Sequence, residues 1–182
     1  MVFGGEVAYW ATGCKIRGKL DPMDGKTHKR SLKQSARIWG MKKVFPWIRG
    51  MTLGARVAVI DDMGRFMLVK HTYSAPWIFP GGGVERGETC MEAALREMEE
   101  EAAIVATGPL QLHGIFSNEA DFRGDHLAFY VCREFERKVF VPNSEIAAAE
   151  FFAADALPAI TSAGSRRRIE ELVSGQPPSD RW

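Results

Sequence analysis

The amino-acid sequence predicts an α/β fold, in which helices sandwich a mixed β-sheet in an α/β/α arrangement. Several short apolar runs of strand length surround one central helical segment, and a second helical segment follows near the end of the chain. The 182 residues are 46% hydrophobic and 26% charged, which suits one globular domain whose core needs no disulfide or structural metal. This composition excludes a largely disordered chain.

The first predicted strands form a hairpin. Residues 55–60 and 65–70 are apolar runs on either side of an acidic turn that ends in glycine, which is typical of a β-hairpin. A third strand is expected at 77–79, because Pro80 and the glycines at 81–83 should end it in a loop.

The central helix is predicted from 89 to 102. Thr89 and Glu92 have the spacing of a capping box, which marks its first turn. Its core face is expected to carry four apolar residues at helical spacing, Met91, Leu95, Met98 and Ala102. The remaining predicted elements are strands at 110–116, 127–135 and 150–152 and a closing helix at 165–173.

The predicted domain organisation has three parts. Residues 1–30 are expected to be a poorly ordered leader, and residues 176–182 a C-terminal tail. Between them, 31–175 forms a single domain that begins with a basic amphipathic helix at 31–50. The stretch 25–60 contains nine Lys or Arg residues and no acid, so this helix is either a solvated face or a surface that contacts phosphates, nucleic acid or a membrane.

Charge and cysteine content restrict the partners and the compartment. The 24 basic and 23 acidic residues give a net charge of +1, so the chain as a whole is not a polyanion binder. Its three cysteines, Cys14, Cys90 and Cys132, are widely spaced, which favours a reducing cytoplasm over a disulfide framework. Because no apolar stretch is long enough to span a bilayer, no membrane partner is expected.

Three glutamates share one face of the predicted central helix. Glu97, Glu100 and Glu101 are three or four residues apart, where like charges repel. Such a run is either a solvated charged face or a site for a hard divalent cation, which takes oxygen ligands. The small side chains of Ala93 and Ala94, beside this face, are expected to leave room for a ligand.

The glycine run and the acidic helix together form a longer pattern over residues 82–104. Its order is Gly, five residues, Glu, seven residues, Arg-Glu, an aliphatic, any residue, Glu-Glu, and an aliphatic three residues later. This pattern resembles the box of the Nudix hydrolase family. The matching residues are Gly82, Glu88, Arg96, Glu97, Met98, Glu100, Glu101 and Ile104. Ala103 stands where the family has glycine, a residue that adopts positive φ at little cost.

The resemblance implies a set of site residues. Glu97 and Glu101 correspond to the principal ligands of Mg²⁺, for which Mn²⁺ could substitute, and Glu100 and the Gly81 carbonyl correspond to further ligands. Arg96 and Glu88 correspond to an ion pair that orients the loop and the helix. Glu145 is a weaker candidate for a metal ligand or general base, in competition with acids of another loop, Glu119, Asp121 and Asp125.

The reaction implied by the resemblance is hydrolysis of a diphosphate bond in a nucleoside diphosphate linked to a group X. A glutamate would accept the proton of the attacking water while Mg²⁺ neutralises the diphosphate. Substrate contacts are expected from Gly82 and Gly83 and, by stacking, from Trp77 and Phe79, unless these aromatic residues belong to the core. The alternatives are hydrolysis of RNA 5′ ends and a non-catalytic nucleotide sensor, and a homodimer is left open.

Overall fold

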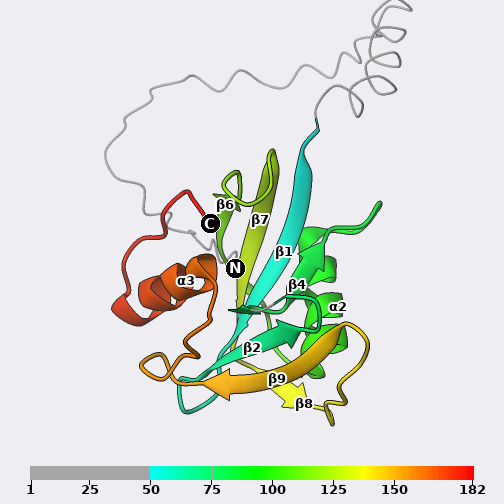
Figure 1. The fold of residues 1–182 in the computed structure, drawn as a ribbon, viewed down its shortest axis with the longest axis vertical. Helices are drawn as coiled ribbons and strands as arrows, with labels where there is room; N and C mark the ends of the chain where they lie inside the picture. The colour runs from blue at the N-terminus through cyan, green and yellow to red at the C-terminus, as the bar shows by residue number, and fades with distance from the viewer. Residues whose placement is uncertain (1–49, 75) are drawn as a thin grey trace, which may run out of the picture. The chain divides into compact units, whose positions relative to one another are not determined.

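The computed structural model describes residues 50–74 and 76–182 (Figure 1). The expected leader at 1–30 and all but the last residue of the expected basic helix at 31–50 lie outside this part of the chain. Within the described part, no helix is long and apolar enough to cross a membrane.

The larger sheet has four strands in the order β4-β1-β7-β6. Their bounds are β1 Thr52–Val59, β4 Gly81–Gly83, β6 Gln111–Ser117 and β7 Asp125–Cys132. β1 and β7 pair in parallel, whereas β4 and β6 pair antiparallel with their neighbours. The mixed sheet expected from the sequence is therefore confirmed.

Two smaller sheets complete the strand content. β3 (Trp77–Ile78), β2 (Phe66–His71) and β9 (Ile146–Phe152) form one antiparallel sheet. β5 (Ile104–Ala106) and β8 (Phe135–Arg137) form a two-stranded ribbon that the sequence analysis did not predict as such. The predicted strand at 127–135 is thus two strands, because β7 ends at Cys132 and the chain turns before Phe135.

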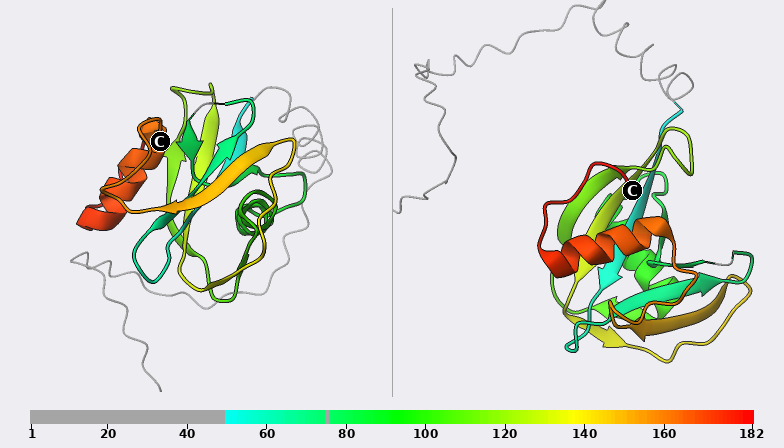
Figure 2. Two further views of the ribbon diagram at one scale, coloured as in Figure 1. Left: turned by 60° about the horizontal axis from the view of Figure 1, so that its bottom comes forward. Right: turned by 60° about the vertical axis from the view of Figure 1, so that its left-hand side comes forward.

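The helices α2 (Cys90–Ala102) and α3 (Ala163–Ser174) lie on opposite sides of the larger sheet (Figures 1 and 2). One core cluster joins α2 to one face of the strands through Val57, Met67 and Met98, all fully buried. A second cluster joins α3 to the other face through Phe129 and Ile169. Alternate residues of β1 therefore enter different cores, which gives the α/β/α sandwich predicted from the sequence.

The hairpin predicted at 55–70 is wrong, because β1 and β2 belong to different sheets. The acidic turn exists, with the Asp61 carboxylate accepting the backbone N–H groups of Met63 and Arg65, but only the isolated bridge between Ile60 and Phe66 joins the two strands. Both strands are buried on both faces, and β1 lies between β4 and β7. Buried strands of this kind carry continuous apolar runs, which do not specify their partners.

The predicted glycine loop at 81–83 is instead strand β4. Gly81 pairs with Arg56, and Gly83 pairs with Gly54. A Cβ added at Gly81, where φ is 148°, would lie 2.1 Å from the Ala55 carbonyl oxygen. Only glycine permits this approach of two backbones, so the run of glycines builds a closely packed strand.

Helix α2 begins at the predicted capping box but buries a different face. The Thr89 hydroxyl accepts the Glu92 N–H, and the Glu92 carboxylate accepts the Thr89 N–H. Met91 is 44% exposed, whereas Ala93 and Ala94 are fully buried, so the expected core face is partly wrong. The alanines leave no space for a ligand, because their small side chains let α2 pack closely on the sheet.

The final residues, expected as a tail, pack against the domain. The Ser117 N–H donates to the Asp180 carbonyl and the Trp182 N–H donates to the Ser117 carbonyl, both over 2.9 Å. Residues 180–182 thus run beside the free edge of β6 in the described structure.

Candidate active site

A cavity of about 520 Å³ lies among β1, β4, α2 and the start of α3. The charged and imidazole side chains of its lining come from several elements and are Arg56, His71, Glu97, Glu101, Asp121 and Glu145. Gly81, Gly82 and Gly83 form part of the same wall. The structure therefore brings the glycine run together with two of the three helix glutamates that the sequence predicts as a site.

Glu101 is the most deeply buried carboxylate of the cavity, with 5% of its surface exposed. Its Oε2 accepts the Gly81 N–H at 2.8 Å, and its Oε1 lies 3.3 Å from His71 Nε2. Burial raises the pKa of Glu101 to about 7, since the Gly81 hydrogen bond offsets only part of the desolvation and Glu97 adds negative charge. A cation bound beside this carboxylate would therefore stabilise its negative charge.

Glu97 lies one helical turn before Glu101 and is half-buried. Burial raises its pKa, although Arg96 Nη1 donates to Glu97 Oε1 at 2.7 Å and opposes this shift. A Cβ at Gly82 would lie 2.3 Å from Glu97 Oε1. Glycine at this position therefore leaves the space that the Glu97 carboxylate occupies.

Arg96 ties the helix to the segment before it. Its Nε and Nη2 donate to the two carboxylate oxygens of Glu88 at 2.9 and 3.1 Å, and Nη2 also reaches the Gly83 carbonyl at 3.2 Å. The hydrogen bonds from Arg96, together with one from the Glu85 N–H, hold the pKa of Glu88 below its usual range. Glu100 lies outside the cavity lining, with its exposed carboxylate 3.4 Å from Arg96 Nη1.

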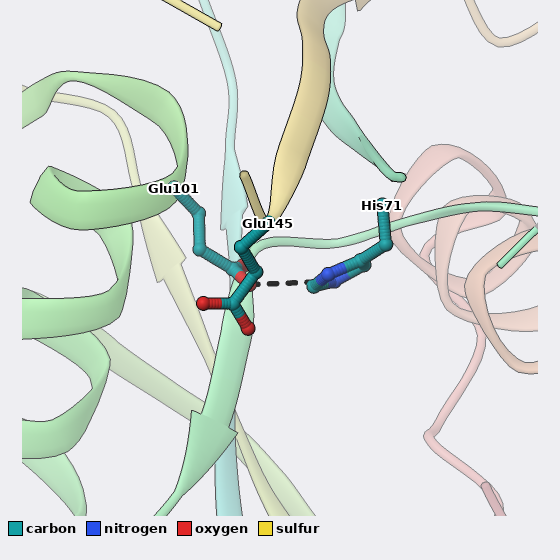
Figure 3. Close-up of side chains that lie close together, drawn as sticks. All are labelled: His71, Glu101 and Glu145. Carbon is teal, nitrogen blue, oxygen red and sulfur yellow. Dashed lines mark ion pairs between the residues drawn. The ribbon is translucent and has the colours of Figure 1, made fainter. Parts of the chain in front are cut away.

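Glu145 and His71 approach Glu101 from the second sheet (Figure 3). Glu145 directly precedes β9, and its backbone carbonyl accepts the Thr72 N–H at the end of β2. Potential ligand atoms of His71, Glu101 and Glu145 all lie within 4.8 Å of one another. Burial, reinforced by Arg56, lowers the pKa of His71, so its imidazole is neutral near pH 7. The sequence analysis did not predict His71 as a site residue.

Arg56 is a site residue that the sequence analysis counted only as part of a basic stretch. Its Nη1 donates to the Phe79 carbonyl at 2.7 Å, and burial lowers its pKa despite the opposing charges of Glu101 and Glu97. Gly81 contacts the Arg56 side chain closely, since a Cβ added at Gly81 would lie only 2.9 Å from Arg56 Cγ. A lone arginine within the apolar run at 55–60 was the available signal.

The aromatic residues expected to stack on substrate lie elsewhere. Phe79 is fully buried in the core between the sheet and α3. Trp77 packs edge-on against Phe152, with ring centroids 4.9 Å apart, and neither Trp77 nor Phe79 lines the cavity. The predicted stacking role is therefore corrected to a core role for both, since Trp77 in β3 and Phe79 directly after it pack into the same core cluster. Gly82 and Gly83 do line the cavity, as expected for substrate contacts.

The competing acidic loop is largely occupied by its own hydrogen bonds. Asp125 accepts hydrogen bonds from the Thr52 hydroxyl and from the Asn118 amide, and Glu119 accepts the Gly124 N–H. Asp121 alone of the three acids in this loop lines the cavity. Asp125 and Glu119 therefore hold the loop in place.

The donor set around Glu101 fits a hard divalent cation. Glu97, Glu101 and Glu145 offer carboxylate oxygens, which Mg²⁺ and Mn²⁺ prefer, and His71 adds a neutral imidazole. The raised pKa of the buried Glu101 reflects incomplete compensation of its charge within the protein. A cation bound between these carboxylates would supply that compensation.

The chain resembles known proteins in sequence and in fold. A family model for the NUDIX domain matches residues 51–172. A Bacillus subtilis (strain 168) protein named "Putative 8-oxo-dGTP diphosphatase" is 27% identical over 124 residues, or 68% of this chain and 81% of that protein. The solved structure of a MutT NUDIX hydrolase from Burkholderia pseudomallei is 26% identical, with a TM-score of 0.59 over 66% of this chain and 97% of that one.

The fold recurs at lower identity. A solved UDP-X diphosphatase has a TM-score of 0.60 at 22% identity, covering 81% of this chain and 74% of that chain. A solved ADP-ribose pyrophosphatase from Streptococcus suis 89-1591 has a TM-score of 0.54 at 24% identity, covering 72% and 95%. The glycine run meets Glu97 and Glu101 at one cavity. Because the family model also spans most of the chain, the chain belongs to the Nudix family of hydrolases.

Proposed function

We propose that the chain is a Mg²⁺-dependent pyrophosphohydrolase that cleaves the diphosphate of a small nucleotide or a nucleotide-linked metabolite. The observation that carries the proposal is the buried Glu101 carboxylate, which shares a cavity of about 520 Å³ with Glu97, Glu145 and Arg56. This cavity has the volume of a small-molecule site and combines carboxylates for a cation with a guanidinium for a phosphate.

Glu97 and Glu101 are the proposed principal Mg²⁺ ligands, with Glu145, Glu100 and the Gly81 carbonyl as further ligands. Mn²⁺ is the proposed substitute. When bound, the cation neutralises charge on the diphosphate and makes an attacking water more acidic. Arg96 holds the Glu97 carboxylate in place through its 2.7 Å hydrogen bond, so the proposed ligands are oriented by the protein itself.

The residues around the cation position have distinct proposed roles. Glu145 is the proposed acceptor of the proton from the attacking water, because it lines the cavity beside Glu101. Arg56 binds non-bridging phosphate oxygens with the guanidinium donors that do not contact Phe79. Water adds to one phosphorus as the anhydride P–O bond breaks, so the products are a nucleotide and phosphorylated X.

The similar proteins support a nucleotide substrate without naming it for this chain. The names of the relatives refer to an 8-oxo-dGTP diphosphatase, a UDP-X diphosphatase and an ADP-ribose pyrophosphatase. All three names denote hydrolysis of phosphoanhydride bonds in small nucleotides. We therefore propose this reaction class and leave X to the assay.

The test measures product release from nucleoside triphosphates, nucleotide sugars, ADP-ribose and dinucleoside polyphosphates, with Mg²⁺ or Mn²⁺. Glu101→Gln is expected to lower kcat at least 100-fold, because it removes a proposed ligand charge. Glu99→Gln is the matched control on the same helix, since Glu99 is exposed and pairs with Lys138 outside the cavity. Wild-type turnover by Glu101→Gln would contradict the proposal. Ligand-induced stabilisation with no turnover of any substrate would favour the non-catalytic sensor.

A further inference from the structure

Residues 179–182, called here the C-terminal segment, lie beyond the family match at 51–172, and the last of them, Trp182, lines the cavity. Backbone hydrogen bonds between Ser117 and residues 180 and 182 fasten the segment to the edge of β6. The Trp182 side chain is half-buried and contributes to the cavity lining. A part of the chain outside the matched domain therefore reaches the proposed active site.

A fully buried arginine of α3 fixes the position of the C-terminal segment. Arg168 donates from Nη1 to the Arg181 carbonyl at 3.1 Å and from Nη2 to the Ser179 hydroxyl at 2.9 Å. Its charge is balanced by Glu171, whose Oε1 lies 2.7 Å from Nη2, and its guanidinium carbon lies 4.0 Å from the Phe116 ring centroid. The segment is therefore already ordered before any ligand binds, so ligand binding does not have to reduce its conformational entropy.

The indole of Trp182 is held by close packing. Its ring centroid lies 5.9 Å from that of Phe116 and 5.4 Å from that of Phe129, both in edge-on geometry. On the other side it contacts α3 at Gly164, where an added Cβ would lie 2.3 Å from the indole Nε1. A rigid aromatic surface of this kind loses little entropy on binding a ligand.

The lining of the cavity contains uncharged side chains as well as charged ones. Trp182, Phe122 and Leu127 are apolar, and Asn118 adds a neutral amide. Asp121 adds an exposed carboxylate to the lining, which disfavours a further anionic group close to it. Glu97 and Arg56 are charged lining residues that suit the diphosphate and its cation. The indole of Trp182 suits an uncharged planar ring.

We propose that Trp182 stacks on the nucleobase of the substrate, so that the C-terminal segment makes the site prefer nucleotides over diphosphates that lack a base. The inference rests on the proposed function, because it assigns the part of the ligand beyond the diphosphate. Base–aromatic stacking tolerates different bases, so the segment favours a base as a class.

The test compares two kinds of non-hydrolysable ligand by calorimetry in the presence of Mg²⁺. One kind comprises the α,β-methylene analogues of ADP, GDP, CDP and UDP, and the other is methylenediphosphonate, which has no base. Trp182→Ala is expected to weaken binding of the tightest nucleoside analogue about tenfold or more. Methylenediphosphonate affinity should stay within twofold, and Trp182→Phe should recover most of the loss.

Gly164→Ala provides an independent perturbation that keeps the tryptophan. The new methyl group must displace the indole, so this variant should also weaken the nucleoside analogue selectively, and adding Trp182→Ala should cause no further loss. Val173→Ala, on the exposed face of α3, should match wild type. Circular dichroism and thermal unfolding show that each variant is folded.

Each remaining outcome has a distinct meaning. Equal weakening of both ligand kinds by Trp182→Ala, or no weakening of the nucleoside analogue in either folded variant, would overturn the role of Trp182 while leaving the proposed hydrolysis intact. If methylenediphosphonate and all nucleoside analogues fail to bind wild-type protein, both proposals fall.

Discussion

Ala103 adopts a backbone conformation that favours glycine. It caps α2 with φ 54° and ψ 40°, and it is the only non-glycine residue with positive φ in the described structure. Its N–H donates to the Glu99 carbonyl, so the left-handed turn closes the helix. The family's glycine at this position thus has a physical reason, which the alanine of this chain meets at a cost in strain.

Ala103→Gly is expected to raise the free energy of unfolding by about 1 kcal/mol, because relief of left-handed strain outweighs the added freedom of the unfolded chain. Urea unfolding monitored by circular dichroism measures the change. Ala102→Gly makes the same substitution one residue earlier, inside the helix, and should instead destabilise by about 1 kcal/mol or more. Destabilisation by Ala103→Gly would show that packing of the Ala103 methyl group outweighs the strain.

Glu101 should make the stability of the metal-free protein depend on pH. Burial raises its pKa to about 7 in the folded chain, against 4.5 as its ordinary value. Between these values the folded state binds more protons than the unfolded state, so this contribution to stability falls as pH rises from about 4.5 to 7. His71, whose pKa burial lowers, contributes with the opposite sign, so the Glu101 effect is measured as a difference between variants.

In EDTA, Glu101→Gln should therefore gain stability over wild type as pH rises from 5 to 8, by roughly 1–3 kcal/mol. Urea unfolding at both pH values measures this difference. Glu99→Gln, on the exposed side of the same helix, should follow the wild-type profile. A constant difference between Glu101→Gln and wild type at both pH values would contradict the raised pKa.

At the scale of elements, β4 positions the helix glutamates. A side chain at Gly82 would meet Glu97 Oε1 at 2.3 Å, whereas one at Gly83 would meet no atom within 4 Å. Gly82→Ala is therefore expected to weaken Mg²⁺ binding at least tenfold by displacing Glu97, and Gly83→Ala should keep wild-type Mg²⁺ affinity. Calorimetric titration with Mg²⁺ measures both. Equal affinities in the two variants would remove Glu97 from the proposed ligands.

The elements that the sequence predicted well are those specified by local chemistry. Helix α2 begins at its capping box, and α3 ends at Gly175 in left-handed geometry, because caps involve residues close in sequence. Strand partners were not predictable in this way. The run at 55–60 pairs with β7, about 70 residues away. The sequence of an apolar run that is buried on both faces does not indicate which strand it pairs with.

The same distinction applies to the site. Glu97 and Glu101 could be predicted because their spacing lies within one helix and resembles a family box. Arg56, His71 and Trp182 reach the cavity only through sheet pairing and the C-terminal segment. No local pattern marked His71 or Trp182, and the only local signal for Arg56 was its place within an apolar run. Trp77 and Phe79 were expected at the cavity because they are close to the glycine run in sequence. Alternate residues of a strand point to opposite faces, so closeness in sequence does not by itself place a side chain at the cavity.

At the scale of the whole molecule, the two buried cores share the sheet, and the cavity lies at the junction of elements from both. α2 packs on one face and contributes Glu97 and Glu101, whereas α3 packs on the other and anchors the segment that carries Trp182. The two proposed halves of the substrate site therefore belong to different layers. The proposed cleavage of a nucleotide requires both layers to keep their relative position, and both layers pack on the same sheet.

The salt dependence of turnover by the whole chain distinguishes the two substrate classes. With a net charge of +1, the chain as a whole does not attract polyanions strongly. A small nucleotide contacts few charged groups, so kcat/KM at constant free Mg²⁺ should fall less than about tenfold between 50 and 200 mM KCl. An RNA substrate bound through six to ten phosphates would lose roughly 10³–10⁵ in affinity over the same range, because counterions are released on binding. Initial rates with the best small substrate and with 5′-triphosphorylated RNA, measured on the full chain, separate the two classes. Preferential turnover of RNA with a steep loss in salt would replace the small-molecule proposal, since the basic stretch at 25–60 would then take part in binding.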